Sequence, residues 1–584
     1  MGGAENDASL LHLPPFSAAS IWDLAGGLWL AGLWYCAPAI CGNDRSAVTR
    51  AASAGVLGIA LPFALGLCDA LYAPALWIAL AAVAGVRVRR VGWSDRDRSA
   101  SGPSWDLPVL LCGLVALAWP AAVRPLMDGD SLGYHLPNAA SWVVHHGVWT
   151  TGTRYWWYPS GSELFASGLF AVGGPAVAGL AGLLPALVLG LRLRAIAVAN
   201  GNPALLGTSI ACTLLATSVA SAQLVSLQNN LWLAAFFLEA LVASRPAAIA
   251  VVALVKPYGW VLAAIAAWLP RAGAASPALR LLAFAPLAVW ALRDLALLAG
   301  AIVPPASTWY PGTAGTSIAA HLPGAFGVLV AAAWAAGPVW AALMLAATAS
   351  IAFAREGWLR WVAFASLVLF LIVPFGYAND VPQLANGQSL RFALPFVALG
   401  AAALCMLRGR FVVALIPAAL AASVVGIAGV WSVYWNDAAT HDVRIVVILA
   451  ALVGIALALA RRGMPRFAIG AAAFCLAAAW AGGLAGARPA AYLADRYGAA
   501  GVPAGGFAAF AATTFGRVVV VGLPAGAATL LRPGVDAYDA GSGEACARAR
   551  ATGSGLLLGL PAGAGGLSCG RVLFEDRSSA VVAP

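Results

Sequence analysis

Charged residues are scarce in this sequence. Of its 584 residues, only 10% are Asp, Glu, Lys or Arg, whereas 62% are hydrophobic and the mean hydropathy is +0.86. Soluble domains carry about 25% charged residues, so this scarcity excludes a soluble globular protein. Apolar runs long enough to cross a bilayer recur from start to finish. We therefore predict an all-α polytopic membrane protein surrounded by a lipid bilayer.

Lysine is almost absent, because Lys256 is the only lysine among the 33 basic residues. The formal net charge of +10 could indicate nucleic-acid binding. However, the arginines lie in short clusters between apolar runs, as the positive-inside rule predicts for cytoplasmic loops. We therefore expect no nucleic acid among the partners. The first 20 residues contain no Lys or Arg, so we also expect no cleavable signal peptide.

Threading the apolar runs between the arginine clusters predicts about 15 or 16 helical segments, with both termini outside. The run 247–270 is interrupted by Lys256-Pro-Tyr-Gly259. Because proline and glycine break helices, we expect two short helices here that meet near the outer face. The expected spans are 20–40, 51–68, 70–86, 106–122, 164–191, 203–222, 229–244, 247–270, 279–301, 337–354, 358–376, 391–407, 411–431, 443–460 and 466–486.

The character of the sequence changes near residue 490. Short strand-like runs at 517–522, 555–559 and 571–574 alternate there with Gly-, Pro- and Ala-rich stretches. We predict a small exported α/β domain, in which Cys546 and Cys569 are candidates for a disulfide bond. The expected organisation is additional N-terminal transmembrane helices in 1–100, a membrane core in 101–410 with its first outer loop at 123–163, C-terminal transmembrane helices in 411–488, and the α/β domain in 489–584.

Four polar stretches lie on the side of the membrane opposite the arginine clusters. They are 123–163, the break at 256–259, about 302–320 and about 377–391. Because all four are expected on one side, we predict that they converge on a single site.

The first of these stretches contains two acids, Asp128 and Asp130, in the run Arg124-Pro-Leu-Met-Asp-Gly-Asp-Ser-Leu-Gly-Tyr-His-Leu-Pro137. Acids held at a bilayer surface are costly and usually functional. Either acid can serve as a general base that accepts the proton of an attacking hydroxyl group. The alternative is a loop acid that caps the following helix. We favour the functional role.

Histidines follow the acids. His135, His145 and His146 are three of only six in the chain, and they either bind a phosphate or a metal or, for at least one of the last two, face solvent. No tight ligand spacing such as H-E-x-x-H is present, so we assign no metal ligands, and a need for a divalent cation (Mg²⁺ or Mn²⁺) stays open. Pro137 and Gly147 bound a short helix expected to lie in the membrane plane.

Three basic residues lie outside the cytoplasmic clusters. Lys256 either snorkels to an interface or, as we favour, is presented to a phosphate by the helix break. Arg391 opens a span on the outer side and either binds a phosphate through its guanidinium or snorkels to lipid headgroups. Arg293 lies beside Asp294 late in a span, where an internal ion pair is the simpler interpretation.

Amide and acid side chains mark the outer ends of two further spans. Asn229 and Asn230 either bind sugar hydroxyl groups or cap their helix. Glu163 either orients a partner or stabilises its helix through the helix dipole.

The pattern Asp130-x-x-x-Tyr134-His-Leu-Pro137, followed by Trp142 and by Tyr158-Pro-x-Gly-x-Glu163-Leu, resembles the GT-C superfamily of polytopic glycosyltransferases. The likeness is to the bacterial polyprenyl-phosphate-dependent branch, which is related to protein mannosyltransferases and lipid A aminoarabinose transferases. It covers about residues 105–410. Its further motifs, in order, are Gln228-Asn-Asn-Leu231, Lys256-Pro-Tyr-Gly, Ile302-Val-Pro-Pro-x-x-x-x-Tyr310-Pro and Arg391-Phe-x-x-Pro395.

The resemblance implies an inverting transfer of sugar from a polyprenyl-phosphate carrier to a hydroxyl acceptor on a glycan, lipid or protein. Asp130 would be the base, with Asp128 the alternate, and Lys256 and Arg391 would bind the carrier phosphate. The location implied is a bacterial inner (cytoplasmic) membrane, with the site and the C-terminal domain facing the periplasm. The other expected substrate-binding residues are Tyr134, His135, His146, Tyr158, Glu163, Asn229, Asn230, Tyr258, Arg293 and Tyr310.

Two features depart from the family pattern. About three spans precede the usual first one, and Asn stands at 229 and 230, where the family often has an acid. A multi-pass transporter or lipid flippase is the alternative function, because broken helices beside a charged residue are typical of transporters. We favour the glycosyltransferase because the sequence shows no inverted repeat and its acids gather in an outer loop.

Overall fold

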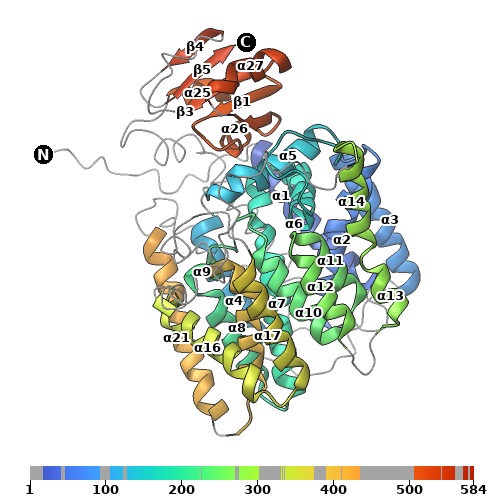
Figure 1. The fold of residues 1–584 in the computed structure, drawn as a ribbon, viewed down its shortest axis with the longest axis vertical. Helices are drawn as coiled ribbons and strands as arrows, with labels where there is room; N and C mark the ends of the chain where they lie inside the picture. Colours follow the sequence, from blue (N-terminus) through green and yellow to red (C-terminus); the bar gives the residue numbers. More distant parts are fainter. Residues whose placement is uncertain are drawn as a thin grey trace, which may run out of the picture.

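Apolar helices make up most of the described chain, as its composition predicts. The structure, a computed structural model, describes residues 18–40, 46–91, 106–122, 126, 128–224, 226–269, 275–300, 330–331, 333–334, 336–373, 390–409, 411–434, 505–540, 542–559, 570–575 and 579–583. The expected spans 443–460 and 466–486 lie outside these residues. In Figure 1 the helices form a bundle, and a small sheet domain drawn in red covers one end of it.

The N-terminal helices begin and end close to the expected runs. They are α1 (Ala18–Cys36), the short turn η2 (Ala37–Ala39), α2 (Ala47–Leu67), α3 (Ala73–Val91) and α4 (Asp106–Ala122). α1 and α2 pack against α6, and α2 also contacts α7. The additional N-terminal helices are therefore integrated into the bundle.

Residues 161–199 form two helices where a single span, 164–191, was expected. α6 (Gly161–Ala178) and α7 (Leu183–Ala199) are joined by the turn η4 (Gly179–Gly182). Gly174 adopts a positive φ of 78°, a backbone conformation that glycine tolerates. Pro175 follows it inside the helix and has no N–H to donate. These two residues kink α6 shortly before η4, so the expected run 164–191 is not one regular helix.

α10 (Asn230–Ala243) is the central helix of the bundle. Its side chains are apolar apart from Asn230 and Glu239, which is typical of a helix buried on every side, and its residues from Asn230 to Leu241 are buried. It contacts α7, α11 and α20. The other helices of this part are α8 (Ala204–Leu215), α9 (Ser218–Ser221), α11 (Pro246–Val255), α12 (Gly259–Trp268), α13 (Pro277–Leu282), α14 (Ala285–Leu297), α16 (Pro338–Phe353), α17 (Gly357–Ile372), η7 (Arg391–Ala393), α20 (Leu394–Cys405) and α21 (Phe411–Tyr434).

The break in the run 247–270 is confirmed. α11 ends at Val255, Lys256 has an extended backbone (φ −155°, ψ 154°), and α12 begins at Gly259. A side chain on Gly259 would lie 2.2 Å from the carbonyl oxygen of Val252. Glycine is therefore needed here, because the second helix starts directly against the end of the first.

Among the described residues, three helical stretches are long and apolar enough to cross a membrane: Ala47–Leu67, Gly161–Ala199 and Phe411–Val430. Large apolar side chains also project from the outside of α16, α17 and α21. Phe353, for example, is 81% exposed and Phe411 79%. Apolar surface on this scale marks a region that meets an apolar partner.

The C-terminal residues fold as a five-stranded α/β domain, as predicted. Strand order is β2-β1-β3-β5-β4, with β2, β1 and β3 parallel and β5 antiparallel to β3 and β4. β2 and β5 were not expected. Cys546 is disulfide-bonded, and its predicted partner Cys569 lies outside the described residues. The elements are α25 (Gly505–Ala511), β1 (Arg517–Val521), α26 (Gly526–Leu531), β2 (Asp536–Asp539), α27 (Ser542–Thr552), β3 (Gly555–Gly559), β4 (Arg571–Glu575) and β5 (Ser579–Ala583).

Candidate functional site

The two acids of the first polar stretch have different surroundings. They precede a π-helical turn, η3 (Ser131–His135), which continues into α5 (Leu136–Val144). Asp128 accepts hydrogen bonds from the Ser131 backbone N–H (2.8 Å) and from Gln228 Nε2 (3.2 Å). Asp128 therefore holds the start of the turn, which is the capping role that the sequence left open.

Asp130 contacts a cation from a distant part of the chain. Its carboxylate forms an ion pair with the guanidinium of Arg391, which begins η7 at the entry to α20. Only 12% of the Asp130 side chain and 8% of the Arg391 side chain are exposed. An ion pair in such surroundings is weakly screened, so the two groups influence each other strongly.

Lys256 reaches the same place from the helix break. Its Nζ donates to Asn230 Oδ1 (2.7 Å) and lies 4.4 Å from the centre of the Phe392 ring. Since Phe392 follows Arg391 directly, the ammonium and the guanidinium are neighbours. The structure thus brings together one acid and two cations from three polar stretches. Each of these residues is at least 126 positions from the next in the sequence.

The two asparagines at the start of α10 differ in role. Asn230 accepts from Lys256 and, at 3.3 Å, from the Tyr258 hydroxyl. Asn229 donates through Nδ2 to the carbonyl oxygen of Val255 (3.2 Å), the last residue of α11. Asn229 therefore satisfies the end of a neighbouring helix, whereas Asn230 faces the lysine of the site.

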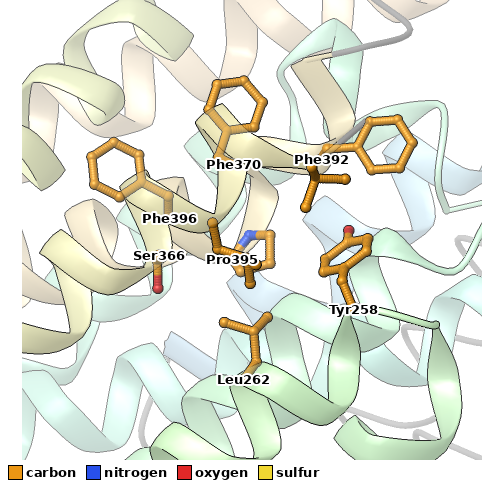
Figure 2. A pocket seen from close by; sticks show the side chains of 9 residues that line it. Tyr258, Leu262, Ser366, Phe370, Phe392, Pro395 and Phe396 are labelled. Atoms are coloured by element: carbon orange, nitrogen blue, oxygen red, sulfur yellow. The ribbon is translucent and has the colours of Figure 1, made fainter. Parts of the chain in front are cut away.

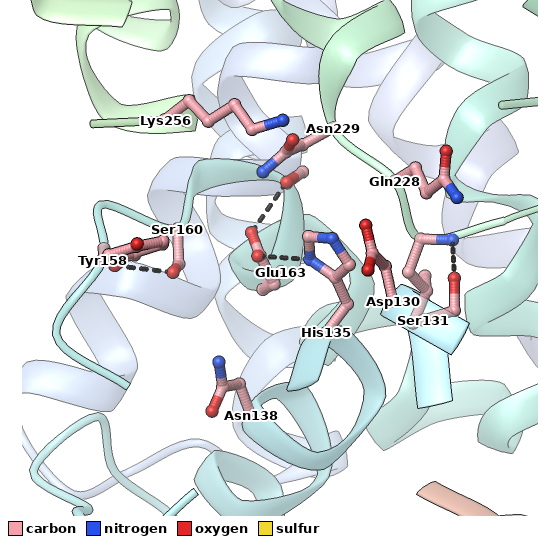
Figure 3. A network of polar contacts seen from close by, with 12 residues as sticks. Asp130, Ser131, His135, Asn138, Tyr158, Ser160, Glu163, Gln228, Asn229 and Lys256 are labelled. Carbon is pink, nitrogen blue, oxygen red and sulfur yellow. Dashed lines mark hydrogen bonds and ion pairs between the residues drawn. The ribbon is translucent and has the colours of Figure 1, made fainter. Parts of the chain in front are cut away.

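A buried histidine and glutamate form a second polar pair. His135 Nδ1 lies 2.6 Å from Glu163 Oε1, as Figure 3 shows. The Ser162 hydroxyl donates to Glu163 Oε2 (2.7 Å). The carboxylate accepts, so Nδ1 carries the hydrogen in this contact, and in the neutral imidazole Nε2 is then an acceptor. Glu163 therefore orients a partner, which was one of its two expected roles.

Tyrosines line the side of the site next to this pair. The Tyr134 ring lies 4.0 Å from that of His135, and Tyr155 contacts both Tyr134 and Tyr158. Tyr155 has a left-handed backbone (φ 56°), which is uncommon for a bulky residue and is found at functional sites. Burial, and then the nearby Asp130 carboxylate, raise the pKa of Tyr134 well above its usual value, so its hydroxyl stays a neutral donor.

Two expected substrate-binding residues lie elsewhere. Arg293 is fully buried and donates to the carbonyl oxygens of Val148, Thr150 and Trp156 as well as to Asp294. The alternative interpretation, an internal ion pair, is what the structure has. The His146 ring stacks at 3.8 Å on Tyr72 in the turn between α2 and α3. Arg293 and His146 thus both have partners within the fold, and Tyr310 lies outside the described residues.

Two glutamines of the site had no role assigned from the sequence, although Gln228 is part of a quoted motif. Gln228 hydrogen-bonds to Asp128, and its side-chain oxygen accepts from Gln223, which in turn accepts from Asn230 Nδ2. The Ser131 hydroxyl accepts from the Leu227 backbone N–H (2.8 Å). Gln228 stands directly before Asn229 in the sequence, so its position was a usable signal. Nothing in the sequence pattern marks Gln223.

An apolar pocket adjoins the cations. Figure 2 shows the rings of Tyr258, Phe392 and Phe396 around it, between α12, α17 and α20. Tyr258 and Phe392 also contact the Lys256 ammonium, so they connect the polar site to the apolar pocket. The remaining residues that line it are Leu262, Ser366, Leu369, Phe370, Val373 and Pro395.

Among the described residues, no group of three or more His, Cys, Asp or Glu side chains lies close enough to hold a metal ion. Asp130 contacts Arg391, Glu163 contacts His135, and Asp128 accepts from the Ser131 N–H and from Gln228.

No protein-family model matches the chain, and no curated protein matches it. The chain is similar to two crystal structures of ArnT from Cupriavidus metallidurans, one bound to undecaprenyl phosphate and one in the apo state. Sequence identity is 15% and 16%, and the TM-score is 0.41 for both. The matches cover 82% of this chain and 98% and 97% of those chains.

Proposed function

We propose that this chain is a GT-C-type glycosyltransferase of the bacterial inner membrane, which transfers a sugar from a polyprenyl-phosphate carrier to a hydroxyl acceptor. The observation that supports this most is the buried contact between Asp130 and Arg391, with Lys256 beside it. A base and two phosphate-binding cations are what this reaction requires at one place.

The two cations suit a phosphate ester. Guanidinium binds phosphate oxygens in a bidentate manner, and ammonium binds them as a point charge. Lys256 donates to a neutral amide oxygen, that of Asn230, and a phosphate would supply an anion to match its charge. As the bond between the sugar and the phosphate breaks, negative charge grows on the leaving phosphate. Fixed cations in dry surroundings stabilise that charge.

Asp130 serves as the general base in this proposal. The acceptor hydroxyl oxygen attacks the anomeric carbon of the sugar, the bond from that carbon to the phosphate oxygen breaks, and the hydroxyl proton passes to Asp130. A single displacement inverts the anomeric centre. Before the donor binds, Asp130 neutralises Arg391. A bound phosphate would take over Arg391 and leave the carboxylate free to accept a proton.

The pair of His135 and Glu163 would hold the sugar or the acceptor. With Nδ1–H donated to Glu163, the imidazole presents an acceptor nitrogen for a hydroxyl group. Tyr134 contributes a neutral hydroxyl donor beside it. The apolar pocket of Figure 2 would receive the first part of the polyprenyl chain, since it lies directly next to the cations.

A transfer assay tests this function. Full-length protein in detergent is given undecaprenyl phosphate carrying a radiolabelled sugar, together with glycan, lipid or protein fractions of a bacterial envelope as acceptors. We expect label in one acceptor fraction and release of undecaprenyl phosphate. If vesicles with the protein move the labelled lipid between leaflets but transfer no sugar, the chain is a transporter or flippase instead.

A further inference from the structure

The C-terminal domain touches the turn that carries Asp130. Gly526, the first residue of α26, packs on the backbone of η3, and a side chain there would lie 2.6 Å from the carbonyl oxygen of Leu132. Only glycine permits this approach. Leu132 is two residues from Asp130 in the sequence. A shift of the domain would therefore move the backbone next to the acid.

A second contact lies at the far end of α5. His145, the residue at which α5 ends, places Nε2 2.8 Å from Asp536 Oδ2. Asp536 begins β2 and is only 1% exposed. The same carboxylate oxygen accepts from the Tyr538 hydroxyl and lies 3.7 Å from Arg517 Nε. A buried carboxylate with these partners fixes the end of α5 to the edge of the sheet.

A third contact follows in the loop after α5. Arg548 Nη2 donates to the carbonyl oxygen of Gly152 (3.1 Å), and the Tyr538 ring packs against Gly152. β2 is an edge strand of the sheet, and α5 contacts it. Figure 1 shows α5 directly beneath the domain. The domain therefore contacts the turn before α5, the end of α5 and the loop that follows it.

The other side of the same loop is held by the N-terminal helices. In the turn between α2 and α3, the Leu71 N–H donates to the His146 carbonyl oxygen (2.8 Å), and the Val148 N–H donates to the Gly66 carbonyl oxygen (3.0 Å). The Trp149 indole N–H donates to the Leu67 carbonyl oxygen (3.0 Å). Two neighbouring histidines thus attach the end of α5 to two different parts of the chain.

We infer that the C-terminal domain is a positioning unit for Asp130, and that His145 and Asp536 are the positioning pair through which it acts. The domain holds η3 and α5 against the fixed turn between α2 and α3, and so keeps the carboxylate at the place where the acceptor hydroxyl arrives. This inference rests on the proposed function for its kinetic consequence, while the mechanical link between domain and helix stands independently of it.

The test uses the full-length protein with two substitutions at one position. His145→Leu removes the donor to Asp536, whereas His145→Gln retains one, because the glutamine Nε2 can occupy the place of the imidazole Nε2. Turnover of undecaprenyl-phosphate sugar is measured together with hydrogen exchange of the backbone amides of 131–144. Arg571→Gln is the control, since it removes an exposed charge from β4 at the opposite edge of the same sheet.

We expect His145→Leu to lower kcat about tenfold with little change in KM, because small misplacements of a catalytic group are costly. Exchange of the 131–144 amides should become faster. His145→Gln should restore both values, and Arg571→Gln should change neither. Asp536→Asn, a substitution in the other partner, should reproduce the exchange effect if His145→Leu does not fold.

Unchanged exchange in both His145→Leu and Asp536→Asn would overturn the inference, as would a loss that His145→Gln does not restore. If the parent protein shows no turnover with any acceptor, the proposed function fails. The exchange measurement then still decides whether the domain holds the helix.

Discussion

Lys256, the one lysine of the sequence, predicts a local feature of the structure but not its own partner. Lys256 precedes Pro-Tyr-Gly259 in an apolar run, and the helix break that this pattern predicts is present. Its partner is less accessible to sequence reasoning. Asn230 is 26 residues away, and only the packing of α10 against α11 brings the amide to the ammonium. The local sequence thus predicts the helix break, whereas the hydrogen-bond partner of Lys256 depends on the fold.

Replacing Lys256 by methionine should weaken the binding of undecaprenyl phosphate. A hydrogen bond to a charged group contributes about 1.5–3 kcal/mol, which corresponds to a loss of affinity of roughly 10- to 150-fold. Thermal stability should fall little, since methionine fills an apolar site without a charge to bury. Binding is measured by titration in detergent, with Lys256→Arg as the control that keeps the charge. Equal affinity of the parent and Lys256→Met would remove this residue from the phosphate site.

Arg293 shows how one helix can hold a neighbouring loop in place. It lies in α14 and gathers the carbonyl oxygens of Val148, Thr150 and Trp156 into one buried contact. Trp290, one turn earlier, donates to the Trp157 carbonyl oxygen (3.1 Å). This helix therefore holds the backbone of the loop that carries Tyr155. The sequence predicts the ion pair of Arg293 and Asp294 but not the contacts of Arg293 with the loop backbone.

Arg293→Met should therefore destabilise the protein by about 3–5 kcal/mol, since it leaves the buried Asp294 carboxylate without its cation. The double variant Arg293→Met with Asp294→Asn should recover part of that loss, because no uncompensated charge remains. Thermal unfolding in detergent measures both. A double variant that is less stable than Arg293→Met would show that the ion pair is not what makes Arg293 necessary.

The elements that sequence reasoning missed have physical causes. The interruption at Gly174-Pro175 lies inside a long apolar run, whose hydropathy hides the helix-breaking pair. β2 reads Asp-Ala-Tyr-Asp and lacks the β-branched residues of a typical strand, because it is an edge strand that pairs on one side. By contrast, β1 and β3 are buried apolar runs and were predicted.

Asp539, at the end of β2, gives this domain a pH dependence. Burial raises the pKa of its carboxyl group to about 6, although Arg154, the Ala525 N–H and Arg548 act in the opposite direction. The folded domain therefore binds the proton more tightly than the unfolded chain. The associated stabilisation is complete below about pH 4 and is lost as the pH rises through about 6.

Asp539→Asn mimics the protonated form and keeps an acceptor for the Ala525 N–H. We expect the parent to match this variant in thermal stability near pH 4.5 and to fall below it near pH 7. The comparison is made by thermal unfolding of both full-length proteins at a series of pH values. A difference that stays constant with pH, or that favours the parent at high pH, contradicts this assignment.

At the scale of the whole molecule, parts of the polar stretches 123–163 and 256–259 meet Arg391 at one place. The stretch 302–320 and residues 377–389, which were expected at the same place, lie outside the described residues. The C-terminal domain lies on the turn that carries the acid. This meeting of distant stretches was predictable because the positive-inside rule assigns all of them to the same expected side of the membrane. The sequence could not predict the contacts of His145 with Asp536, since these join residues 391 positions apart.

The account depends above all on Asp130 as the base, and one comparison tests it most directly. Asp130→Asn and Asp128→Asn make the same chemical change two residues apart, in full-length protein supplied with undecaprenyl-phosphate sugar and its acceptor. We predict that Asp130→Asn lowers kcat by about 10²–10⁴-fold while it still binds undecaprenyl phosphate, and that Asp128→Asn mainly lowers stability. Normal turnover by Asp130→Asn, in protein that folds and binds the carrier, would contradict the account.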